Sequence, residues 1–189
     1  LISESTYGGR VGQSRTETEQ RLVKACEAAL DRGGKVLCPV LAIARTQELI
    51  ALFTEHGLLD RYPVFIDGSA REISESYIKR GVLPERVRRR YVTGAEHRDA
   101  LLNSSLPIMV LAPSGMMGGG LVIEYALRWS PYPENLIALS CYQDPCSPGY
   151  TVLRARGRAV RFRDERTDEY TSVILNAEVG NFPLSAHAD

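Results

Sequence analysis

The segment LPIMVLAPSGMMGGGLVIEYALRW, residues 106–129, decides the fold that this sequence predicts. Its first part, residues 106–114, is an apolar run with the length of a buried strand. A glycine-rich stretch at residues 115–120 interrupts the run, and residues 121–129 then carry apolar side chains at helical spacing. A strand with two apolar faces that leads directly into a helix is typical of a parallel sheet covered by helices.

The same alternation of apolar strands and amphipathic helices extends over most of the chain. It predicts further strands at residues 35–42, 62–68 and 135–143, and helices at residues 14–32, 45–59, 69–81 and 96–104. Residues 83–94 are expected to be irregular or to form a short edge strand, whereas the alternating segments 151–162 and 172–179 predict antiparallel strands. The predicted fold class is therefore α/β. We expect a mainly parallel sheet with helices on both faces, in a Rossmann-like or flavodoxin-like three-layer arrangement, with short antiparallel strands near the C-terminus.

The composition places few limits on function. A length of 189 residues favours a single domain, and 44% hydrophobic with 24% charged residues is ordinary for a globular protein. The 23 basic and 23 acidic residues balance, so the overall charge indicates no particular partner. No apolar run approaches the ~20 residues that a membrane span needs, and no signal peptide is visible. We therefore expect no membrane association.

The cysteines and histidines match no metal-binding spacing. Cys26 and Cys38 lie in apolar stretches and are predicted to be small core residues. Cys141 and Cys146 are expected to be free thiols, because nothing else in the sequence indicates an oxidising compartment; a disulfide between them is the alternative, since they are close in sequence. Because neither HxH nor HxxxH occurs, metal binding by this chain alone is not expected.

Two strand-to-helix junctions carry candidate ligand-binding groups, because ligands of such sheets meet the loops that follow the carboxyl ends of strands. In residues 114–120 the glycines allow a close backbone approach, which suits an anion, with a tight structural turn as the alternative. Arg45, in the ARTQE junction at residues 44–48, either points to the same edge or is a solvated residue of the first helical turn. The basic run at residues 88–90 is interpreted as a solvated face.

Arginines recur at every second position near the C-terminus. Arg154, Arg156 and Arg158 are predicted to share one face of a strand, and Arg161 and Arg163 repeat the spacing. Such a stripe either contacts a phosphate backbone or keeps an edge strand soluble.

Five motifs in order resemble the β-CASP domain of metallo-β-lactamase-fold RNA-processing nucleases, in the branch that includes the cleavage-and-polyadenylation endonuclease. They are ESTYGGR (residues 4–10), ARTQE (44–48), SGMMGGG (114–120), YQ (142–143) followed by SPG (147–149), and SAHAD (185–189). The resemblance covers essentially the whole chain. It implies that residues 1–189 are one β-CASP domain of a larger chain, whose metallo-β-lactamase domain flanks both ends.

This resemblance implies that Glu4 and His187 are catalytic, Glu4 as an acidic residue beside the metal site and His187 as a histidine near the scissile phosphate. A histidine that faces the leaving oxygen can donate a proton to it. A carboxylate hydrogen-bonded to the imidazole holds its orientation and keeps it protonated. The resemblance also implies substrate-binding roles for Tyr7, Arg10, Arg45, Ser114, Gly115, Met116, Tyr142, Gln143 and Ser185.

The resemblance further implies a cytoplasmic zinc-dependent ribonuclease whose β-CASP domain binds single-stranded RNA. Two zinc ions are expected in the metallo-β-lactamase domain, where they would polarise the phosphate and generate a hydroxide nucleophile. None is expected on this chain, which alone should be inactive; oligomer formation stays open. Gly12, Cys141 and Tyr150 stand where the family usually has histidine, glycine and arginine, so these RNA contacts are expected to differ.

Two other functions remain open at this point. The chain could be a free-standing flavodoxin-like module that binds a phosphate or a nucleotide at residues 114–120. It could also be a catalytically dead scaffold of an RNA-processing complex.

Overall fold

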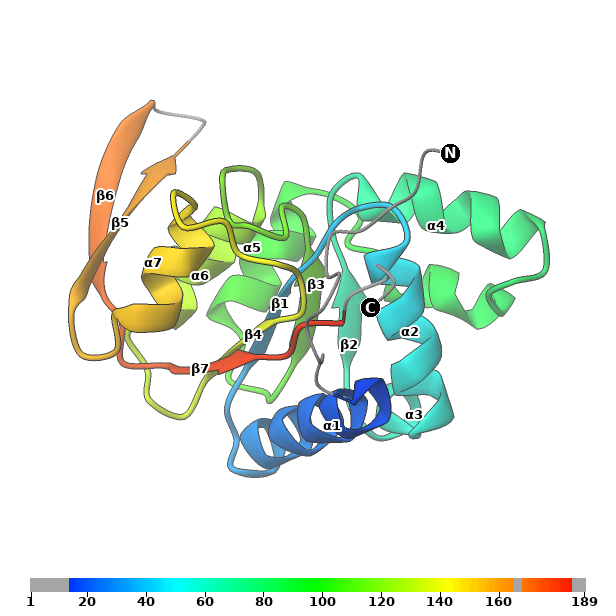
Figure 1. Cartoon of the computed structure of the whole chain (residues 1–189). Coiled ribbons are helices and arrows are strands. Elements are labelled where there is room, and N and C mark those ends of the chain that lie inside the picture. Colours follow the sequence, from blue (N-terminus) through cyan, green and yellow to red (C-terminus); the bar gives the residue numbers. More distant parts are fainter. Residues whose placement is uncertain (1–13, 165–167, 185–189) are drawn as a thin grey trace, which may run out of the picture.

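The computed structural model describes residues 14–164 and 168–184. A five-stranded parallel sheet runs through the middle of this part of the chain, in the strand order β2-β3-β1-β4-β7 (Figure 1). Its strands are β1 (Val36–Pro39), β2 (Val64–Ile66), β3 (Met109–Ala112), β4 (Leu136–Leu139) and β7 (Glu178–Asn181).

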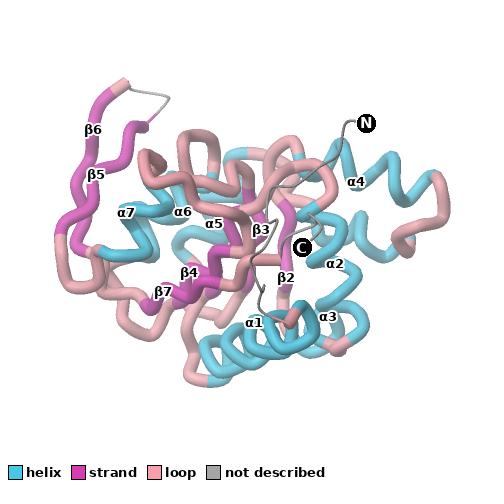
Figure 2. The backbone as a smooth tube through the Cα atoms, viewed as in Figure 1, coloured by secondary structure: helices cyan, strands magenta, loops and turns pink. Residues whose placement is uncertain are grey.

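Helices cover both faces of the sheet, as Figure 2 shows. One face carries α1 (Arg15–Asp31), α2 (Arg45–Glu55), α3 (Leu58–Arg61) and α4 (Ala70–Lys79). The other carries α5 (Ala95–Asn103), α6 (Val122–Trp129) and α7 (Pro148–Arg154).

Two hydrophobic cores lie between the sheet and these helices, because each central strand is apolar on both faces. In β1, Val36 and Cys38 belong to the core under α1 and α2, whereas Leu37 belongs to the core under α6. All four residues of β1, β3 and β4 are buried. The predicted fold class is confirmed, and so is the core position of Cys26 and Cys38.

The first helix begins at a serine that caps it. The Ser14 hydroxyl accepts a hydrogen bond from the Glu17 amide at 3.4 Å, which satisfies one of the free donors of the first turn. Leu22, Cys26 and Leu30 then follow at helical spacing and are buried in the core.

The C-terminal quarter differs from the prediction in two elements. Residues 151–154, expected in a strand, belong to helix α7 instead. The segment 172–179 is divided between β6 (Glu169–Ile174), which pairs antiparallel with β5 (Ala159–Asp164), and β7, which joins the main sheet parallel to β4. The β5–β6 ribbon stands beside the main sheet (Figure 1). Its Val160 and Phe162 side chains are buried in the hydrophobic core between the sheet and α6.

The predicted arginine stripe is therefore wrong in its first half. Arg154 lies in the last turn of α7 with its guanidinium 4.5 Å from the centre of the Tyr150 ring, and Arg156 lies in the turn that follows. Arg161 and Arg163 do alternate with buried residues on β5, as their spacing predicts. There Arg161 lies over the Tyr170 ring and Arg163 pairs with Asp168.

The segment 83–94 contains a 3-10 helix, η1 (Glu85–Arg90), rather than an edge strand. A single parallel bridge joins Tyr91 to Ile66 at the end of β2.

All four cysteines are free, so the disulfide between Cys141 and Cys146 does not form. Across residues 14–164 and 168–184, no helix combines the length and the apolar character that a membrane crossing requires.

Candidate functional site

The carboxyl ends of β1, β3 and β4 form the place where ligands are expected in this topology. The connection after β1 leads to α2 on one face of the sheet, whereas the connections after β3 and β4 lead to α6 and α7 on the other face. Neighbouring connections that diverge in this way leave an opening at the edge of the sheet.

The loops after β3 and β4 are tied together by the side chain of Gln143. Its Nε2 donates hydrogen bonds to the carbonyl oxygens of Gly115 and Cys141, both at 3.0 Å. The Gly149 amide donates to the Met116 carbonyl at 2.9 Å, which seats the start of α7 on the same loop. Gly115, Met116 and Gln143, all predicted to bind substrate, are thus brought together.

The neighbouring residues Tyr142 and Gln143 differ in what they can offer to a ligand. Gln143 is only 8% exposed and its amide nitrogen is occupied, so it holds the loops in place. Tyr142 is 59% exposed, and its side chain makes no hydrogen bond to any residue that the structure describes. An exposed aromatic ring beside a polar loop can stack on a nucleobase.

The glycine-rich loop borders an open hollow. The Ser114 hydroxyl accepts a hydrogen bond from the Gly118 amide at 2.9 Å, which folds the loop back on itself. The hollow has a volume of ≈ 490 Å³ and is lined by Gly68, Ser69, Pro113, Ser114, Gly118, Gly119, Gly120 and Leu121. Glycine-rich backbone in such a concavity suits a phosphate group. Gly68 and Ser69 were missed in the sequence, although the DGS triplet after a strand is a usable signal.

A buried ion pair supports the wall of this hollow. Asp67 is fully buried at the end of β2 and accepts hydrogen bonds from Arg98 at 2.6 and 3.1 Å. It also accepts from the Tyr125 hydroxyl at 2.9 Å and from the Gly68 amide at 2.7 Å. Burial, followed by the negative charge of Asp67 and this hydrogen bond, raises the pKa of Tyr125 well above its usual range. The network links β2, α5 and α6, and sequence reasoning missed it.

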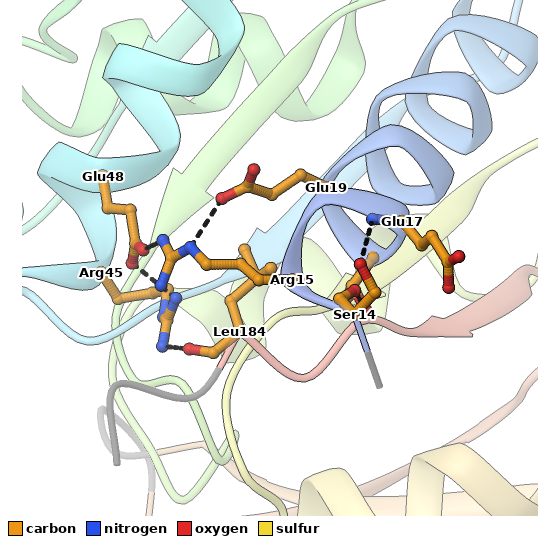
Figure 3. A network of polar contacts seen from close by, with 8 residues as sticks. Ser14, Arg15, Glu17, Glu19, Arg45, Glu48 and Leu184 are labelled. Atoms are coloured by element: carbon orange, nitrogen blue, oxygen red, sulfur yellow. Dashed lines mark hydrogen bonds and ion pairs between the residues drawn. The ribbon is translucent and has the colours of Figure 1, made fainter. Parts of the chain in front are cut away.

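Arg45 is committed to partners within the chain. Its guanidinium donates to the Glu48 carboxylate and to the Leu184 carbonyl (Figure 3). The Arg45 side chain is only 12% exposed. Burial lowers the pKa of Arg45, an effect that the neighbouring Cys141 thiol opposes. The Nε atom is buried without a hydrogen-bond partner among the described residues. Arg45 therefore fastens the segment before Ser185 to the start of α2.

The two ends of the described chain meet at this position. Arg15, at the start of α1, pairs with Glu48 and with Glu19, and Glu48 also pairs with Arg45, which holds Leu184 (Figure 3). Five of the predicted site residues lie outside the described residues: Glu4, Tyr7, Arg10, Ser185 and His187.

The described residues do not fit a zinc site. Within residues 14–164 and 168–184, no group of three or more histidine, cysteine, aspartate or glutamate side chains could hold a metal ion. We therefore assign no step of a reaction on this part of the chain to a metal.

The fold and the site define an α/β domain that carries polar, glycine-rich loops at the carboxyl edge of its sheet. A family model described as the Beta-Casp domain matches residues 46–152, which is more than half of the 189 residues. The chain belongs to the Beta-Casp domain family.

The chain is also similar to curated proteins over nearly its full length. It is 30% identical to the transcription termination factor FttA of Thermococcus kodakarensis, covering 100% of this chain and 32% of that protein. It is 29% identical to the RNase aCSPSF2 of Saccharolobus solfataricus, covering 100% and 37%. It is 30% identical to the ribonuclease TTHA0252 of Thermus thermophilus, covering 92% and 44%. The chain thus spans less than half the length of these relatives.

Proposed function

We propose that this chain is the RNA-binding domain of a zinc-dependent ribonuclease that hydrolyses phosphodiester bonds in single-stranded RNA. The observation that carries the proposal is the Beta-Casp match over residues 46–152, together with similarity to two proteins named as ribonucleases. This membership favours a nuclease over a free-standing flavodoxin-like module.

The geometry supports a path for RNA along the carboxyl edge of the sheet. Backbone groups of the glycine-rich loop border a hollow that would accept a phosphate. The exposed ring of Tyr142 follows β4 on the same edge and would stack on a base. Gln143 and Gly115 act indirectly, because they hold these two loops against each other.

Glu4 and His187 supply the chemistry in this proposal. His187 would donate a proton to the leaving oxygen of the scissile phosphodiester, and Glu4 would orient its imidazole. Arg45, at the start of α2, holds the carbonyl of Leu184, which lies three residues before His187 in the sequence. The zinc ions belong, in this proposal, to a metallo-β-lactamase domain, so the chain alone is inactive.

Replacement of Tyr142 by alanine in the intact protein tests the RNA path. We expect affinity for single-stranded RNA to fall by about 1–3 kcal/mol, because one base loses its stacking partner. Tyr142→Phe should bind normally. The measurement is fluorescence anisotropy with a labelled oligoribonucleotide. The thermal unfolding midpoint of both variants should stay unchanged, since the side chain is exposed.

Tyr132 provides a matched control. It is 50% exposed and lies between α6 and β4, at the amino ends of the strands. Tyr132→Ala should therefore leave RNA affinity unchanged. Equal losses in the two alanine variants, or no loss in either, would contradict the proposed path.

A further inference from the structure

A second hollow lies beyond the β2 edge of the sheet, where α3 and η1 approach each other. Its volume is ≈ 460 Å³, and it is lined by Leu59, Asp60, Arg86, Arg89 and Arg90. Three of these five residues are arginines, and two of them, Arg89 and Arg90, come from the basic run at residues 88–90 that the sequence suggested was a solvated face.

Contacts between α3 and η1 give this hollow a fixed frame. Arg90 donates a hydrogen bond to the Leu59 carbonyl, and Arg86 donates to the Asp60 carboxylate at 2.9 Å. Arg88 is held away from the lining by Glu75 at 2.7 Å and Glu85 at 3.2 Å. Of the four arginines of η1, Arg88 therefore stays outside the lining, and the other three line the hollow.

The charge of the lining is unbalanced. Three guanidinium groups face one carboxylate, so the hollow carries an excess of two positive charges. Arg89 is exposed and has no ion-pair or hydrogen-bond partner among the residues that the structure describes. Among the described residues, only Arg86 pairs with the Asp60 carboxylate, and both side chains of this pair are about half exposed. The hollow thus presents unused donors to solvent.

Phosphate is the anion that fits this lining best. A carboxylate offers two oxygens, which a single guanidinium fork can satisfy. A phosphate monoester carries a charge of about −1.5 to −2 near neutral pH and three acceptor oxygens, so it can engage several arginines at once. None of the described residues that line the hollow is aromatic, so they offer a base no stacking partner.

We propose that the hollow between α3 and η1 is a phosphate-binding site, with Arg89 as its principal ligand and Arg86 and Arg90 as flanking donors. The site is separate from the glycine-rich loop, which follows β3, and it does not depend on the function proposed above. Its ligand is a phosphate group, whether free, on a nucleotide or at an end of an RNA strand.

The experiment measures binding of inorganic pyrophosphate and of AMP to the intact protein by isothermal titration calorimetry, with adenosine as the uncharged comparison. Arg89→Gln should lower the affinity for both phosphate ligands about tenfold, since it removes charge-assisted hydrogen bonds to the ligand without breaking a described contact within the chain. Asp60→Asn should raise the affinity for both ligands about threefold, because it removes the carboxylate of the described lining.

Arg80→Gln is the matched control. Arg80 is exposed at the end of α4 and is likewise without a described side-chain partner, but it lies outside the hollow. It should leave binding unchanged. A thermal unfolding midpoint equal to that of the parent protein confirms that each variant is folded.

The outcomes separate the site from its alternatives. If Arg89→Gln and Arg80→Gln have the same effect, or if adenosine binds as well as AMP, the proposal is overturned. It is also overturned if polyglutamate binds in an Arg89-dependent way and pyrophosphate does not, since the site would then take an acidic peptide. An Arg89-dependent preference for RNA with a terminal phosphate over the same RNA without it would identify RNA as the source.

Discussion

At the residue scale, Ala44 is one of the non-glycine residues with a positive φ. Its φ is 65° and its ψ is −64°, and the Arg45 amide donates to the Ile43 carbonyl at 2.8 Å. This is the strained form of the γ-turn, which L-residues rarely adopt. The turn lies at the carboxyl end of β1. The strained residue Ala44 therefore directly precedes Arg45, which donates a hydrogen bond to the Leu184 carbonyl.

Replacement of Ala44 by glycine should raise the free energy of unfolding by about 1 kcal/mol, because glycine tolerates positive φ. The control is Ala51→Gly, an exposed position inside α2, which should lower the same quantity by about 1 kcal/mol. Urea unfolding measures both. Destabilisation by the two substitutions alike would show that Ala44 is not strained.

The buried phenol of Tyr125 is expected to lower the free energy of unfolding at alkaline pH. Its phenol is held neutral by burial and by Asp67, which raise its pKa, whereas the phenol of the unfolded chain ionises near pH ~10. Above that pH the unfolded state releases a proton that the folded state retains, so the free energy of unfolding falls as pH rises. Below about pH 9 this contribution is fully present.

Tyr125→Phe should make this fall shallower between about pH 9 and pH 11, because the replaced group no longer titrates. Urea unfolding at several pH values gives the slope. Tyr132→Phe, at an exposed position, should leave the slope unchanged. If the free energy of unfolding of Tyr125→Phe fell with pH as steeply as that of the parent protein, ionisation of Tyr125 would not explain the loss of stability.

At the scale of elements, helix α7 shows where local sequence pattern misleads. Residues 151–154 alternate in a way that predicts a strand, yet Ser147 caps a helix by accepting from the Tyr150 amide at 3.2 Å. Pro148 occupies the first turn, where its missing N–H costs nothing. The Ser-Pro pair was visible in the sequence and outweighs the alternation that follows it.

Most of the central sheet could be predicted because strands with two apolar faces and capped helices are local features. The pairing of β7 could not, since its parallel register with β4 depends on how the chain returns to the sheet. The candidate site could likewise be predicted only in part. Its loops follow from glycines after strands, but the pairing of Asp67 with Arg98 joins residues that only the fold brings together.

Gly149 is the position at which α7 meets the loop after β3. A Cβ there would lie 1.8 Å from the Gln143 side-chain oxygen and 3.0 Å from the Met116 carbonyl oxygen. Gly149→Ala should therefore lower the free energy of unfolding by about 1–3 kcal/mol. Gly118→Ala, whose Cβ would have its nearest neighbour at 3.9 Å, is the control and should cost less. If the two variants unfold at the same urea concentration, the seating of α7 does not depend on this close approach.

At the scale of the whole molecule, the carboxyl edge gathers segments from the full length of the described chain. The Arg15–Glu48–Arg45 network joins the start of α1 to Leu184, so the two described ends meet beside α2 (Figure 3). The loops after β2, β3 and β4 open along the same edge of the sheet. A convergence of Glu4 and His187 at this edge stays a prediction.

Cross-linking of single-stranded RNA carrying 4-thiouridine to the intact protein, followed by mass spectrometry of the peptides, tests the central claim most directly. The account predicts cross-links to peptides that contain Tyr142 and residues 114–116, at the carboxyl edge of the sheet. Cross-links at the amino ends of the strands, in the peptide that contains Tyr132, with none at the carboxyl edge, would contradict it.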